Sequence, residues 1–71
     1  MQTIIEYKTS IYNVESQLNG YTISVDRATS DGEAVEVFFA QGNDAGEFVA
    51  LFESSGALAL LEYLDSAGVE L

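Results

Sequence analysis

Carboxylates are the groups in this chain best able to do chemistry. Its 71 residues include 12 Asp and Glu against two Lys and Arg, giving a formal net charge of −10, and they include no His and no Cys. Nucleophile–base catalysis ordinarily uses one of those two missing residue types. Paired carboxylates can hydrolyse glycosides, but they need a cleft, for which so small a domain has little volume. We therefore predict that the protein is not an enzyme and that it presents a surface to a partner.

Acidic residues also cluster in and beside two glycine-containing segments, 28–32 and 42–46. Such clusters could hold calcium, but neither has the alternating oxygen ligands and closing Glu of an EF-hand loop. Turn chemistry explains both, because Gly adopts positive φ and Asn or Asp hydrogen-bonds its own backbone. A phosphate loop is not indicated either, since no Lys follows the glycines. We predict no metal, no cofactor and no direct contact with nucleic acid, which the negative charge would repel.

The net charge is large for a domain of this size. A compact domain of 71 residues has a radius of gyration of roughly 11 Å, and hence a diameter of roughly 28 Å. Duplex DNA of that length carries roughly 16 charges. The protein therefore approaches the charge density of DNA, and its carboxylates could imitate rows of phosphates. The alternative explanation is a merely soluble surface or adaptation to high salt.

Alternation of apolar and polar residues predicts an antiparallel β-meander of three to four strands. We expect strands over residues 3–8, 21–26, 33–41 and 47–52. The dipeptide Asp31-Gly32 is a strong hairpin signal between the second and third of these strands. The last of the four segments is apolar on both faces apart from its first residue.

The segment between the first two expected strands, residues 9–20, is ambiguous. Ile11, Val14 and Leu18 have helical spacing, whereas Ile11-Tyr12 would suit a strand. We favour a short helix that follows a Thr9 or Ser10 cap and stops at Asn19-Gly20.

The C-terminal segment predicts an amphipathic helix. Ser54 or Ser55 can cap its start, it continues to about Ala67, and Gly68 ends it. Its apolar stripe contains Leu58, Leu61 and Leu64, and Ala57 and Leu60 widen it. This helix must bury its leucines against the sheet, so we predict one α+β domain over residues 1–71 in which the meander packs on the helix.

The opposite face of the sheet and the turns are left for a partner. If Val35, Val37 and Phe39 face the helix, Phe38 lies outside beside Glu36. An exposed aromatic among carboxylates could anchor a basic partner, and homodimerisation through the same face is an equally weighted alternative. Glu6, Asp26 and Glu36 are candidate outward carboxylates on the strands. The residues predicted to bind a partner are Asp26, Asp31, Glu33, Glu36, Phe38, Asp44 and Glu47.

The run from Phe52 to Leu58, with sequence FESSGAL, is followed by Leu61 and Leu64 and is similar to a strand-to-helix junction in some anti-CRISPR proteins. A small, acidic, Cys-free meander with one helix also resembles this class of phage-encoded inhibitors. The resemblance implies a stoichiometric inhibitor that occupies the Lys/Arg groove of a CRISPR effector where DNA would lie. It transfers no functional residue. The alternatives are a small structural or assembly protein, such as a phage or halophile homodimer, and an antitoxin-like inhibitor of a basic toxin.

The sequence gives no indication of a membrane or secretory segment. No stretch approaches 18 uncharged apolar residues, and the first residues lack a basic segment followed by an apolar run. We therefore expect no membrane partner and a cytoplasmic location, which for a phage-encoded protein is the host bacterial cell.

Overall fold

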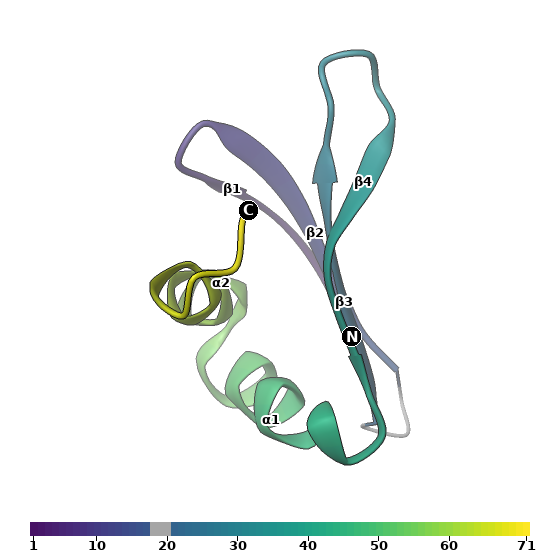
Figure 1. Ribbon diagram of the computed structural model, residues 1–71, viewed down its shortest axis with the longest axis vertical. Helices are drawn as coiled ribbons and strands as arrows, with labels where there is room; N and C mark the ends of the chain where they lie inside the picture. The colour runs from purple at the N-terminus through teal and green to yellow at the C-terminus, as the bar shows by residue number, and fades with distance from the viewer. Residues whose placement is uncertain (18–20) are drawn as a thin grey trace.

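Four strands precede two helices in the computed structural model, which describes residues 1–17 and 21–71 (Figure 1). The elements are β1 (Gln2–Tyr7), β2 (Ser10–Ser16), β3 (Thr22–Ala28), β4 (Ala34–Gln41), a 3-10 turn η1 (Gly42–Asp44), α1 (Gly46–Ser55) and α2 (Ala57–Ser66). The strands form one antiparallel sheet in the order β1-β2-β3-β4. The predicted α+β fold with a meander and a C-terminal helix is confirmed.

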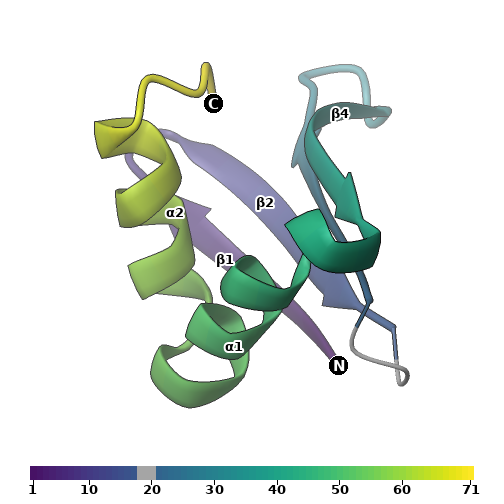
Figure 2. The same ribbon diagram turned by 60° about the horizontal axis from the view of Figure 1, so that its bottom comes forward.

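Both helices lie on the same side of the sheet and enclose the core with it (Figures 1 and 2). Alternate residues of the central strands point into this core, where Val14, Ile23 and Val25 are fully buried. The helices contribute Phe52, Leu60, Leu61 and Leu64. No helix of the described residues lies on the other side of the sheet, so this part of the chain forms two layers with one uncovered sheet face.

The predicted short helix after β1 is wrong, because residues 10–16 form strand β2. A two-residue turn at Lys8 and Thr9 reverses the chain, with Lys8 at φ 56°, and Tyr7 pairs with Ser10. Tyr12 and Val14 are buried while Ile11 and Glu15 are exposed, which is the period of a strand. Leu18 and the predicted stop at Asn19-Gly20 lie outside the described residues.

The predicted strand over residues 47–52 is also wrong, because this segment belongs to helix α1. A short run that is apolar on both faces cannot be assigned to strand or helix by periodicity. The turn η1 takes the chain from the end of β4 onto the face of the sheet. There α1 contacts β3 and buries Val49 and Phe52, three residues apart, in the core.

Helix α2 is present as predicted, but it starts slightly later than predicted and one residue of its predicted apolar stripe is not buried. Ser54 and Ser55 end α1, and Gly56, at φ 93° and ψ 173°, joins the two helices without a side-chain cap. Leu58 is 48% exposed, whereas Leu60, which was predicted to widen the stripe, is fully buried.

The end of α2 agrees with the prediction. Gly68, at φ 92°, follows the helix, and its N–H donates to Asp65 (3.1 Å) while the Val69 N–H donates to Leu64 (3.0 Å). These two bonds form the glycine-dependent motif that closes many helices.

A β-bulge in the β3–β4 pair reverses the predicted facing of the two adjacent phenylalanines. Asp26 pairs with Glu36, yet Val25 pairs with Phe38, so Val37 is an extra residue in β4. Phe38 therefore points toward the helices and packs edge-on against Phe48, with ring centroids 4.9 Å apart. Phe39 points away and is 46% exposed. Phe38 is thus not the outward aromatic that was predicted.

The two adjacent sides of α2 give a matched test of this core. We expect Leu60→Ala to destabilise the protein by about 2–5 kcal/mol, because it leaves a cavity at a fully buried position. That is a large share of the roughly 4–10 kcal/mol available to a chain of this length. Leu58→Ala makes the same change on the exposed side and should cost less than about 1 kcal/mol. Urea unfolding followed by circular dichroism measures both, and equal losses would contradict the packing of α2.

Candidate functional site

The sheet face opposite the helices, here called the open face, lies outside the core. Alternation along each strand places every second side chain there. Its carboxylates are Glu6, Glu15, Asp26 and Glu36, and its large exposed apolar residues are Ile4, Ile11 and Phe39. All four strands contribute, so the surface combines charge with apolar area.

The charge on this face is most concentrated at Asp26 and Glu36. These residues are direct partners across β3 and β4. Side chains at such positions have Cβ atoms about 4.5–5.5 Å apart, and like charges there destabilise the sheet. Asp26 also pairs with Asn13 on β2, and Asn13 pairs with Ile4 on β1. One row of side chains thus crosses the sheet from an isoleucine to two adjacent carboxylates.

Both Lys and Arg side chains lie away from the open face. Lys8 is in the β1–β2 turn and forms an ion pair with Asp65 of α2, at 2.7 Å from Nζ to Oδ2. Arg27 pairs in register with the buried Tyr12 and with Val35, so its side chain points to the helix side. Because these are the only two such residues in the chain, no Lys or Arg side chain neutralises the carboxylates of the open face.

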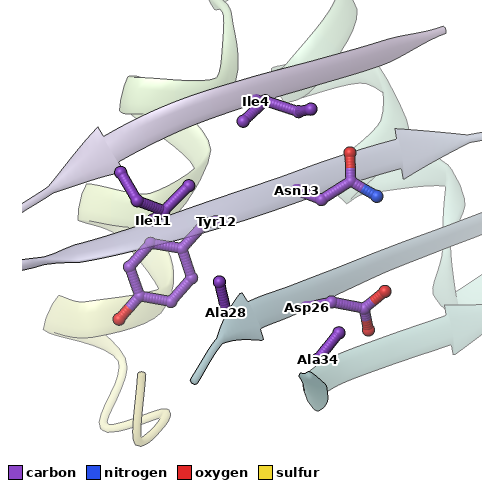
Figure 3. A pocket seen from close by; sticks show the side chains of 7 residues that line it. All are labelled: Ile4, Ile11, Tyr12, Asn13, Asp26, Ala28 and Ala34. Carbon is purple, nitrogen blue, oxygen red and sulfur yellow. The ribbon is translucent and has the colours of Figure 1, made fainter. Parts of the chain in front are cut away.

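A shallow hollow of about 180 Å³ indents the open face. Figure 3 shows its lining, which comes from all four strands and consists of Ile4, Ile11, Tyr12, Asn13, Asp26, Ala28 and Ala34. Ala28 and Ala34 are direct cross-strand partners, and their small side chains leave space beside the isoleucines. The Asn13 Oδ1 accepts a hydrogen bond from Gln2 Nε2 (2.8 Å), which leaves Asp26 as the charged lining group.

Two of the seven predicted binding residues, Asp26 and Glu36, lie side by side on the open face. Glu6, predicted to point outward, lies on the same face, but β2 separates it from β3. Asp44 lies in η1 and Glu47 in the first turn of α1, at the end of β4 opposite the β3–β4 turn.

Asp31 and Glu33 belong to the β3–β4 turn. The Thr29 hydroxyl donates to the Asp31 carboxylate and accepts from the Glu33 N–H. The hydrogen bond from Thr29 lowers the pKa of Asp31, and backbone hydrogen bonds add to the effect. Asp31 therefore stabilises the turn in its charged form.

Several residues of the open face escaped the sequence analysis. Ile4 had a visible signal, because it shares the outward alternation of β1 with Glu6. Ile11 and Glu15 were hidden by the assignment of their segment to a helix. The outward orientation of Phe39 was not predicted, because it depends on the bulge and no residue type in β4 signals a bulge.

The described part of the chain offers no ready metal site. Residues 1–17 and 21–71 contain no group of three or more His, Cys, Asp or Glu side chains arranged to hold an ion. Among the same residues, neither helix has the length and apolarity to cross a membrane.

Comparison with protein-family models, with curated proteins and with solved structures gave no match. Function must therefore be inferred from the open face.

A second polar cluster, on the helix side, holds the β1–β2 turn against α2. The Tyr7 hydroxyl donates to Asp65 Oδ2 at 2.8 Å, and the Lys8 ammonium contacts the same oxygen. The hydrogen bonds from Lys8 and Tyr7 lower the pKa of Asp65. The bond to Asp65 raises the pKa of Lys8 and of Tyr7. Asp65 thus links the two ends of the chain in its ionised form.

This cluster predicts a pH-dependent contribution to stability. Because the folded pKa of Asp65 lies below its unfolded value, the contribution is complete above the unfolded pKa of about 4 and is lost as the pH falls through the folded pKa. We expect Asp65→Asn to lower the melting temperature by a few degrees at pH 7, and the difference from wild type to shrink as the pH approaches 2. Glu53→Gln, an equal charge change on the exposed side of α1, is the control. Thermal unfolding at several pH values measures both, and a pH-independent difference would contradict this assignment.

Proposed function

We propose that this protein is a stoichiometric inhibitor whose open face binds a basic, nucleic-acid-binding surface of another protein. The observation that carries the proposal is a sheet face with four carboxylates that no Lys or Arg of the chain neutralises. A CRISPR effector complex is the target that the resemblance of the sequence suggests. Such an effector would be met in the cytoplasm of the host bacterial cell.

Charge density supports imitation of DNA as the means of binding. The molecule measures 33 × 22 × 18 Å and carries a net charge of −10. Duplex DNA 33 Å long carries roughly 19 charges, so the protein presents about half of that charge over the same length. Neighbouring strands are about 4.8 Å apart and same-face residues about 6.6 Å apart. The protein would therefore imitate DNA through a charge density about half that of the duplex, without matching phosphates one by one.

Binding of cationic side chains would relieve the repulsion between neighbouring carboxylates of the open face. The facing carboxylates Asp26 and Glu36 repel each other in the free state. Lys and Arg side chains of a partner would replace this repulsion with attraction, and the long-range field would speed association. The exposed Ile4, Ile11 and Phe39 would add apolar contact at the same surface. We propose that inhibition is by occupancy, without catalysis and without a cofactor.

Homodimerisation through the open face is the alternative that the exposed apolar residues favour. Ile4 is 68% exposed, which is unusual exposure for a strand isoleucine. Against a dimer, two copies facing each other would bring eight carboxylates into one interface with no Lys or Arg side chain between them. A basic partner meets the same apolar residues without that repulsion. The charge therefore favours a different protein over a second copy.

Two triple variants of equal charge test the proposal. We expect Glu15→Gln, Asp26→Asn and Glu36→Gln together to weaken binding to purified CRISPR effector complexes by roughly 3- to 100-fold, since three exposed ion pairs contribute about 0.6–3 kcal/mol. The control is Asp44→Asn, Glu47→Gln and Glu53→Gln, which removes the same charge from η1 and α1. The control should change the dissociation constant by less than about 3-fold, and salt should weaken all three proteins. Surface plasmon resonance with competing duplex DNA measures both affinity and displacement.

Each contrary result has a definite meaning. Equal weakening by the two triples would refute a role for the open face in particular. Binding to a basic toxin but to no effector would select the antitoxin-like alternative. Sedimentation of a dimer that Phe39→Ser converts to a monomer would select the assembly protein.

A further inference from the structure

We infer that the hollow of the open face receives one arginine side chain of the partner, an inference that rests on the proposed function and specifies its recognition. The hollow combines an apolar lining from all four strands with one carboxylate (Figure 3). This combination matches a side chain with an apolar stem and a cationic end.

The apolar part of the hollow suits the stem of such a side chain. Ile4 and Ile11 form walls on β1 and β2, and the facing Ala28 and Ala34 leave the space between β3 and β4. Arg and Lys bury their methylene groups along apolar surface and keep the charged end in a polar place. Two exposed isoleucines would thereby lose contact with water on binding.

Asp26 supplies the acceptor for the cationic end. It is half-buried, and among residues 1–17 and 21–71 it has neither a hydrogen-bonding partner for its side chain nor an ion pair. Its cross-strand partner Glu36 adds a second carboxylate within reach. A guanidinium carries five N–H donors in a planar fork, so it can bind one carboxylate with two bonds and still face another. Arg is also less strongly hydrated than Lys, which favours Arg at a half-buried site.

Size and charge exclude the other common occupants. Pockets for drug-sized ligands have volumes of about 300–1,000 Å³, whereas this hollow has about 180 Å³. A phosphate-bearing ligand would meet Asp26 and Glu36 and be repelled. A single side chain delivered by a basic protein fits both limits.

Methyl-resolved NMR with defined peptides tests the inference. Hexa-arginine titrated at low salt into protein labelled at Ile and Ala methyl groups should shift Ile4, Ile11, Ala28 and Ala34 along one saturation curve. Asp26→Asn should weaken this binding about 10-fold, because a hydrogen-bonded charge pair is lost. Asp44→Asn, the same change on η1, should weaken it less than about 3-fold. Hexa-lysine should bind several-fold more weakly than hexa-arginine.

A second variant removes the space without altering the charge. Ala34→Leu fills the hollow from an exposed position on β4, and Ala50→Leu makes the same change on the exposed surface of α1. We expect Ala34→Leu to abolish the methyl shifts and the preference for arginine, and Ala50→Leu to retain both. Amide spectra report whether each variant keeps the fold.

Failure of this inference is distinguishable from failure of the proposed function. If Asp26→Asn and Asp44→Asn weaken the peptide equally, if Ala34→Leu binds like wild type, or if lysine binds as well as arginine, the arginine site is refuted. The comparison of the two triple variants for effector binding is a separate measurement, and it can support the proposed function whatever the peptides show. If neither peptide binds, the arginine site is refuted as well, and effector binding alone decides the proposed function.

Discussion

The structure depends on how much sheet two short helices can cover. Each helix has ten residues, and together they bury one face of a four-stranded sheet around Phe52, Leu60, Leu61 and Leu64. Among residues 1–17 and 21–71, no further helix or strand covers the other face. That face instead combines carboxylates and uncharged polar side chains with a few apolar residues. The open face thus follows from the placement of both helices on one side of the sheet.

The position of the two cationic side chains follows from the same division into faces. Lys8 is held by Asp65, together with Tyr7, where the β1–β2 turn meets the end of α2. Arg27 lies on the inward side of β3. Each contributes to the helix side and leaves the open face without a compensating charge. Four of the twelve acidic residues thus lie on a face without Lys or Arg, whereas the other eight share the rest of the molecule with both cationic side chains.

Sequence periodicity was sufficient for most of the sheet and for α2, and it failed where a pattern had two readings. Ile11 and Val14 have the spacing of a helix. Pairing with β1 nevertheless makes this segment a strand, in which Tyr12, Val14 and Ser16 are buried at every second position. Residues 47–52 are apolar on both faces, which fits either element, and packing across the sheet selected the helix. In the site, Asp26 and Glu36 could be placed outward from alternation alone. The bulge that turns Phe39 outward depends on pairing between strands, which one sequence does not contain.

That bulge connects the core to the open face. Without the extra residue, Phe38 would lie opposite Ser24 and Phe39 opposite Ile23; with it, Phe38 meets Phe48 and the small Ala40 lies opposite Ile23. Glu36 keeps its place beside Asp26 in either register. The strand can therefore satisfy the core on one side of the bulge and hold two carboxylates together on the other. Groups fixed on paired strands lose little freedom on binding, so a partner gains from their repulsion without ordering them first. The core supplies the stability that keeps these like charges adjacent, and this is how burial on one face makes recognition possible on the other.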